Sequence, residues 1–244
     1  MDFRESLTAF RRLFPTPSVS SGSKLAVFIT GGGYSFLDFC QACGSSNILH
    51  SSYSPYVARE ALLFIKKYVN NDMFDALDIP REIISSLKSF KSCDINSSIL
   101  YALALRNSIF GNLLLRAANQ DMQCEEDKKE PMPICVSITA ALTTNRYRKG
   151  DNRAYITMIF PNSNSYTYCV EIDKIKEDDH IHIASFPTLL DHTRLDEDRD
   201  VAKIAFAKLV ADDNLMKDLS RTTSVTMVRT IPDSDWRLVL EGTQ

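Results

Sequence analysis

The stretch "KLAVFITGGGYSFLDF", residues 24–39, decides the class of fold that we expect for this chain. It opens with a short apolar run rich in β-forming residues, which the glycines Gly31, Gly32 and Gly33 bring to an end. Aromatic and leucine side chains then recur at helical spacing. A buried strand that leads through a tight loop into a helix is typical of a layered α/β domain.

Outward from this stretch, helical and strand patterns follow one another along the chain. The residues after 172 predict a helix that begins at the acidic run "DEDRD", and a C-terminal hairpin around Pro232 and Asp233. The remaining elements are expected as helices at 58–69, 78–90 and 94–120, and as strands at 134–142, 153–160 and 165–172.

The composition is that of a soluble globular protein, with 44% hydrophobic and 24% charged residues. A formal net charge of -3 gives no overall attraction to nucleic acid or to anionic membranes, so we expect neither as a partner. The amphipathic start at residues 3–14 favours a packed surface helix over a targeting sequence. We therefore predict a cytoplasmic protein, with the nucleus as the alternative.

Six cysteines and four histidines are the candidate metal ligands. Cys40 and Cys43 have C-x-x-C spacing, but without a second pair we expect two packing cysteines and free thiols throughout. His180 and His182 alternate on an expected strand and could hold a metal ion together with Asp191 or His192. A surface strand explains that pair more simply, so we expect no metal and no cofactor.

Four segments occur in the order found in the C-terminal domain of competence-damage-inducible protein A, CinA. They are "AVFITGGG", "YSPYVAREAL", "SITAALTTNRYRKGDNRAYI" and "DEDRDVAKIAFAKLV". The chain resembles the eukaryotic CinA-like branch over roughly residues 10–211, which leaves 212–244 as a C-terminal extension. The resemblance implies a three-layer α/β/α sandwich over a single domain, residues 1–244. It also makes a homo-oligomer a reasonable expectation.

The best-characterised bacterial members of that family are nicotinamide mononucleotide amidohydrolases with a serine nucleophile. At the serine position this chain has Phe28, which cannot attack an amide. Tyr53 and Ser54 match the family's Tyr-Ser pair, but Arg59 stands near the place of a lysine and cannot act as a base. The resemblance thus implies a retained nucleotide pocket without the family's chemistry.

The residues that the resemblance places around a ligand fall in four groups: the glycine loop, the segment 53–59, the segment 139–149 and the pair 199 and 203. Glycine N–H groups at a helix start can face an anion, and arginine forks match phosphate oxygens. A solvated basic turn and a wet helix face are the alternative explanations for the cations. The candidates are Thr30, Gly31, Gly32, Gly33, Tyr53, Ser54, Arg59, Thr139, Thr143, Thr144, Arg146, Arg148, Lys149, Arg199 and Lys203.

Three hypotheses follow from these residues. The first is a domain that binds a pyridine nucleotide or a similar small phosphate ester without serine amidohydrolase activity. The second is a non-enzymatic assembly or partner-binding protein on the same fold. The third is an amidohydrolase with a relocated nucleophile at Thr30, Ser35 or Ser54. The first requires the glycine loop and the turn at 146–149 to share one concavity.

Overall fold

The computed structural model describes residues 24–42, 48–118, 132–161, 164–184, 187–217 and 219–232. Within them, six strands form one sheet in the order β2-β1-β3-β4-β5-β6. β1 pairs in parallel with β2 and β3, and the pairs from β3 to β6 are antiparallel. The strands are β1 Leu25–Thr30, β2 Leu49–Tyr53, β3 Ile134–Ala141, β4 Asn152–Ile159, β5 Ser165–Ile172 and β6 Thr222–Ile231.

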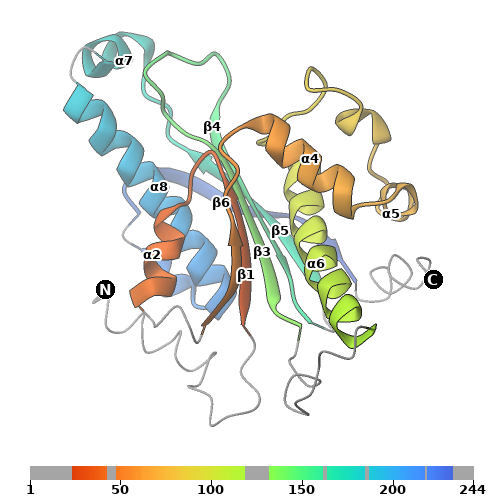
Figure 1. The fold of residues 1–244 in the computed structure, drawn as a ribbon. Helices are drawn as coiled ribbons and strands as arrows, with labels where there is room; N and C mark the ends of the chain where they lie inside the picture. The colour runs from red at the N-terminus through yellow and green to blue at the C-terminus, as the bar shows by residue number, and fades with distance from the viewer. Residues whose placement is uncertain are drawn as a thin grey trace.

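Helices cover both faces of this sheet (Figure 1). α2 (Ser35–Ala42) and α8 (Pro187–Val210) lie on one face, and α4 (Ala58–Tyr68) and α6 (Ile95–Ala118) lie on the other. The chain is therefore a mixed α/β domain. The shorter helices are α5 Asn71–Ala76, α7 Glu177–Ala184 and the 3-10 turns Arg81–Ile84 and Asp213–Met216. None of the described helices is both long enough and apolar enough to cross a membrane.

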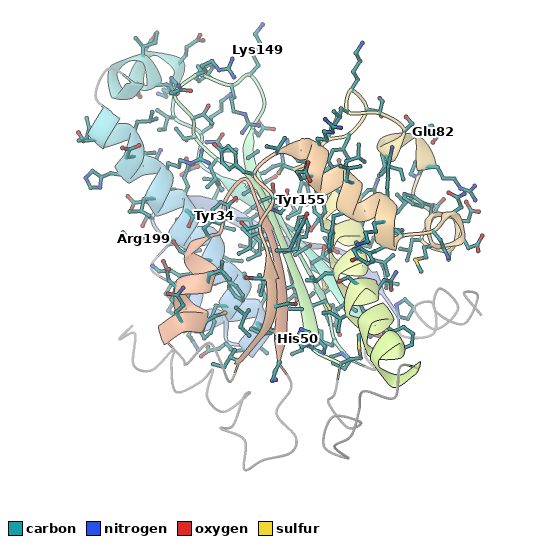
Figure 2. The ribbon with its side chains drawn as sticks, viewed as in Figure 1. Tyr34, His50, Glu82, Lys149, Tyr155 and Arg199 are labelled. Atoms are coloured by element: carbon teal, nitrogen blue, oxygen red, sulfur yellow. The ribbon has the colours of Figure 1, made fainter. Side chains whose placement is uncertain are left out.

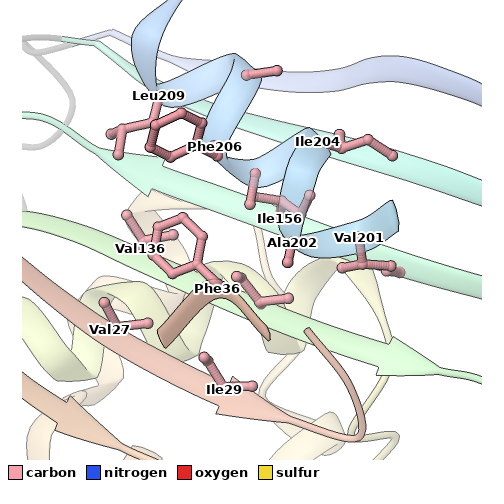
Figure 3. Close-up of a cluster of buried hydrophobic side chains, with 14 of the residues drawn as sticks. Val27, Ile29, Phe36, Val136, Ile156, Val201, Ala202, Ile204, Phe206 and Leu209 are labelled. Carbon is pink, nitrogen blue, oxygen red and sulfur yellow. The ribbon is translucent and has the colours of Figure 1, made fainter. Parts of the chain in front are cut away.

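Strand β1 contributes to both cores, because its alternate side chains point to opposite faces and all six of its residues are buried. Val27 and Ile29 join Phe36 of α2 and Val201 of α8 in the cluster drawn in Figure 3. On the opposite face, Ala26 and Phe28 pack with residues of α4 and α6. Burial on both sides explains why this strand reads as one continuous apolar run.

Phe28 is the largest side chain that β1 sends toward α6. Its ring stacks on Tyr101 at a centroid separation of 4.2 Å and also contacts Tyr53 and Phe64. Phe28 and Tyr101 have no exposed surface. Phe28, which the resemblance places at the family's serine position, therefore lies in an aromatic core.

The strands expected from β-forming runs and the long helix at 94–120 are present with shifted ends. The helix expected at 78–90 is wrong, because that segment forms one 3-10 turn, Arg81–Ile84, that buries none of its residues. Such a turn gains too little apolar packing to extend into a longer helix. Strand β2, "LHSSY", was missed because it lacks the apolar alternation of a strand.

His180 and His182 lie in helix α7, so the expected strand at this place is wrong. Three acidic residues in the first turn suit the positive end of a helix dipole. No group of three or more potential metal ligands occurs within the described residues. The expected N-terminal helix at 3–14, Cys43 and the hairpin turn at Asp233 lie outside the described residues.

Helix α8 begins at Pro187, nine residues before the start that the acidic run predicts. Proline is favoured in the first turn of a helix, because its missing N–H would have no intrahelical partner there. The run Asp196–Asp200 is therefore in the helix interior. Glu197, Asp198 and Asp200 are buried.

We expect the glycine loop to tolerate a β-carbon far less well than the glycine of α6. At Gly31, φ is +78° and a Cβ would lie 2.0 Å from the carbonyl oxygen of Ala140. Gly31→Ala should lower the free energy of unfolding by at least about 2 kcal/mol, from left-handed backbone cost plus steric strain.

The matched control is Gly111→Ala, where a Cβ would meet nothing within 4 Å. It should raise the free energy of unfolding by roughly 0.5–1 kcal/mol, because alanine favours a helix interior. Urea denaturation of both variants measures the two effects. A Gly31→Ala variant as stable as wild type would contradict the loop geometry.

Candidate functional site

The glycine loop brings the end of β1 against the end of β3. Gly31 and Gly33 both have positive φ, at +78° and +87°, a conformation that glycine adopts at little cost. A Cβ at Gly33 would lie 2.5 Å from the side chain of Ile138. The loop is thus shaped by close approach to β3, which explains why glycines stand here.

The backbone N–H groups at the start of α2 bind a carboxylate of the protein itself. Asp198 accepts hydrogen bonds from the N–H groups of Gly33 at 2.5 Å, Tyr34 at 3.0 Å and Ser35 at 2.8 Å. It also accepts the Ser35 hydroxyl at 2.7 Å. The helix start predicted to face an anionic ligand is therefore occupied by Asp198, and for Gly33 the expectation that the glycine N–H groups point into a pocket is wrong.

Two neighbouring carboxylates of α8 fix other loops in the same way. Glu197 accepts the Thr143 N–H at 2.6 Å and the Thr143 hydroxyl at 2.5 Å, just after β3. Asp200 accepts the N–H groups of Ser220 at 3.0 Å and Arg221 at 2.6 Å, just before β6. One turn of α8 therefore positions three loops through hydrogen bonds to buried carboxylates.

Arg194, one turn earlier on α8, joins two of these loops directly. Its guanidinium donates to the carbonyl oxygen of Thr143 at 2.8 Å and to that of Gly31 at 3.2 Å. Because the two carbonyls follow β3 and β1, Arg194 bridges the carboxyl ends of two adjacent parallel strands. In open α/β sheets this edge is the usual place for a ligand.

A pocket of about 760 Å³ opens beside this bridge. Its walls are Gly31, the residues before α6 (90–94), the end of β3 with the residue after it (140–142), and four residues around the start of β4, Gly150, Asp151, Arg153 and Tyr155. Thr144, Arg148 and Arg194 complete the lining. The volume falls within the range of small-molecule sites. We call this concavity the basic pocket.

Cations outnumber carboxylates among the described residues that line the basic pocket. Arg148 reaches the carbonyl oxygen of Leu142 at 3.4 Å, and Arg153 pairs with the Asp151 carboxylate at 2.7 Å. Four cations face two carboxylates, which leaves a net charge of +2. The charged residues are Lys91, Arg148, Arg153 and Arg194 against Asp94 and Asp151.

A thiol and a phenol also line the basic pocket. Burial raises the pKa of the Cys93 thiol to about 12, although Arg148 and Arg153 oppose this shift. The thiol therefore stays protonated near neutral pH and is a poor nucleophile. Burial also raises the pKa of Tyr155, a residue of β4 (Figure 2). Tyr155 and Phe90 provide aromatic surface.

The structure brings some of the residues predicted from sequence into the basic pocket. Gly31, Thr144 and Arg148 line it. Arg146 instead lines a separate small hollow together with His180. Lys149 is exposed at the tip of the turn (Figure 2). We expected the glycine loop and all three cations of the basic turn to share one concavity. Of those three cations, only Arg148 lines the basic pocket together with Gly31.

Other predicted residues have structural partners. The Thr30 hydroxyl donates to the Pro55 carbonyl oxygen at 3.1 Å, and the Thr139 hydroxyl donates to that of Ser92. Tyr53 stacks on Phe64 at 4.3 Å. These side chains pack the ends of the strands and do not line the basic pocket.

The remaining candidates also lie away from the basic pocket. Ser54 and Arg59 are exposed, and Arg199 lies on the outer side of α8, 3.9 Å from Asp196 (Figure 2). Lys203 is half-buried one turn further along α8. None of these residues is among the described residues that line the basic pocket.

Sequence reasoning missed most of the pocket's cations and aromatic side chains. Lys91 and Cys93 precede a long helix, and Asp94 accepts a hydrogen bond from the Asn96 N–H there. In this wall of the pocket, the residue that sequence reasoning could pick out is Asp94, because an aspartate before an apolar helical pattern is typical of a helix cap. Arg194 carried no local signal, because it sits in a stretch of α8 that we expected to lie before the helix.

No family model matches the chain, and no curated protein matches it either.

The Glu197 carboxyl should make stability depend on pH. Burial raises its pKa, opposed by the Thr143 hydrogen bonds and by the Arg221 charge. The pKa of Glu197 is therefore higher in the folded protein than in the unfolded chain. The contribution of Glu197 to stability is full at pH values below its unfolded-state pKa, and it is lost as the pH rises through its folded-state pKa. Wild type should therefore gain stability relative to Glu197→Gln as pH falls from 7 to about 4.

Urea denaturation of both proteins between pH 4 and pH 8 measures this difference. The control is Glu177→Gln, an exposed carboxyl at the start of α7. The difference in free energy of unfolding between Glu177→Gln and wild type should vary much less between pH 4 and pH 8. A wild type that loses stability relative to Glu197→Gln as pH falls would contradict the assignment.

Proposed function

We propose that this chain binds a small phosphate-bearing molecule in the basic pocket and does not carry out serine amidohydrolase chemistry. The observation that supports the proposal most is the net charge of +2 around a pocket of about 760 Å³ at the carboxyl ends of β1 and β3. Guanidinium groups match phosphate oxygens and remain charged at any physiological pH. The site therefore favours an anion.

The aromatic side chains of the pocket support a ligand that also carries a flat ring. Phe90 and Tyr155 lie in the same concavity as Arg148 and Arg153. A ring can stack on an aromatic side chain while its phosphate binds a guanidinium. Together with the resemblance to the CinA-like family, this favours a pyridine nucleotide or a similar small phosphate ester.

The hydroxyl groups nearest the glycine loop support binding without covalent catalysis. Thr30 donates its hydroxyl to a backbone carbonyl, and Ser35 donates to Asp198, whose oxygens already accept three N–H groups. A nucleophilic hydroxyl needs a base in hydrogen-bond reach that is free to take its proton. Phe28, at the family's serine position, lies in the aromatic core.

Arg148→Ala should weaken binding of nicotinamide mononucleotide by about 1.5–3 kcal/mol, or roughly 10- to 150-fold in Kd, if Arg148 holds the phosphate. Calorimetry with the mononucleotide and with its dephosphorylated riboside separates the phosphate contribution from ring binding. The free energy of unfolding should change by less than about 1 kcal/mol, since a charge on a surface loop contributes little to stability.

Arg146→Ala is the matched control, because the two arginines share one turn and Arg146 is exposed outside the basic pocket. Its affinity should equal that of wild type. Equal affinity of wild type for the mononucleotide and the riboside would show that the pocket does not recognise phosphate. The assembly or partner-binding function on the same fold would then be the better explanation.

The purified protein should release no ammonia from nicotinamide mononucleotide above the rate of a sample without protein. Phe28→Ser should stay inactive, since a hydroxyl without a base gains little, and should lose about 3–5 kcal/mol of stability through the cavity it leaves. A coupled ammonia assay and urea denaturation measure the two results. Activity that a pocket substitution abolishes would establish a relocated nucleophile.

A further inference from the structure

The basic pocket continues along the edge of the sheet into a second concavity. This neighbour has a volume of about 270 Å³ and shares two lining residues, Asp151 and Arg153, with the basic pocket. It lies over the ends of β4 and β5, one strand further from β1. We call it the acidic cleft. The two concavities adjoin at Asp151 and Arg153, and we call them together the groove.

The charge of this groove changes sign along its length. Three carboxylates, Asp151, Glu171 and Asp173, face two cations, Arg153 and Lys174, in the acidic cleft. Its net charge is therefore -1, against +2 in the basic pocket. A ligand that spans both regions meets cations at one end and carboxylates at the other.

The hydrogen bonds of the acidic cleft leave its carboxylates negative. Glu171 accepts the Ser224 hydroxyl at 2.6 Å, and Asp173 accepts the Thr223 hydroxyl at 2.8 Å, so both partners are neutral. Neither carboxylate forms an ion pair within the described residues. Both side chains are exposed, so a ligand can reach them.

The lysine of the acidic cleft binds elsewhere. The Lys174 ammonium donates to the Lys149 carbonyl oxygen at 3.2 Å and lies 4.4 Å from the centre of the Tyr147 ring. Both contacts belong to the loop between β3 and β4. Lys174 therefore holds that loop, and the negative end of the groove is available to a cation.

We propose that the ligand of this groove is a phosphomonoester that carries a positively charged group at its other end. This inference rests on the proposed function, because the phosphate occupies the basic pocket. The cationic group lies at Glu171 and Asp173, one or two strand spacings away, or roughly 5–10 Å. The groove thus selects a dipolar small molecule over a uniformly anionic one, which the carboxylates repel.

Hexose phosphates provide probes that differ in the charge at one end. Glucosamine 6-phosphate carries an amine, glucose 6-phosphate is neutral there, and 6-phosphogluconate carries a carboxylate. We expect the amine to bind about five- to tenfold more tightly than the neutral sugar, and the carboxylate more weakly still, as expected for partly exposed charges a few ångströms apart. Inorganic phosphate reports on the basic pocket alone.

Two carboxylate variants test the role of the acidic cleft. Glu171→Gln and Asp173→Asn keep an acceptor for their hydroxyl partners, so the fold should persist. In the double variant the preference for the amine should fall to less than twofold, while the affinity for inorganic phosphate stays equal or rises slightly. Asp178→Asn is the matched control, because it removes one exposed charge outside both concavities and should leave the preference intact.

Each result of the titrations separates the two proposals. Equal affinity for the three sugars, with Arg148-dependent phosphate binding, would overturn the dipolar ligand and leave the phosphate pocket standing. A preference for the amine that survives in the double variant would place the cationic group elsewhere and also overturn it. Absence of binding by all four probes at millimolar concentration would overturn both.

Discussion

Asp198 carries the interaction on which the arrangement of the strand ends depends. A carboxylate with 8% exposure is costly to desolvate, and here four donors from residues 33–35 compensate it. Glu197 and Asp200 repeat the arrangement for the loops after β3 and before β6. Because the three side chains leave one rigid helix, the loops keep a fixed spacing. The walls of the basic pocket follow from that spacing.

Much of the sheet could be predicted from sequence because β1 and β3 to β5 are rich in β-forming residues with apolar runs or alternation. β2 could not, since "LHSSY" is a polar edge strand that exists through pairing with β1 alone within the described residues. The prediction of a helix at 78–90 was wrong for the opposite reason. Its apolar residues suggested a helix, but the segment forms a single 3-10 turn that buries none of its residues, so a longer helix would gain too little apolar packing.

The site was harder to predict than the fold, because its key contacts join residues that are far apart in sequence. Gly31 and Arg148 could be proposed from local patterns, as a tight turn and a basic loop. The role of Asp198 could not, since acids at 196–200 suit a helix start equally well. The helix starts instead at Pro187, which moves these acids into the interior and onto the buried face.

The same helix accounts for the difference between holding a ligand and reacting with it. Asp198 and the Pro55 carbonyl accept the hydroxyls of Ser35 and Thr30, so the groups nearest the loop already donate their protons to structural partners. Arginines dominate the cations that remain in the basic pocket, and they cannot take up a proton. Cys93 stays protonated because burial raises the pKa of its thiol. These cations give the pocket electrostatic attraction for an anion, while its thiol stays protonated.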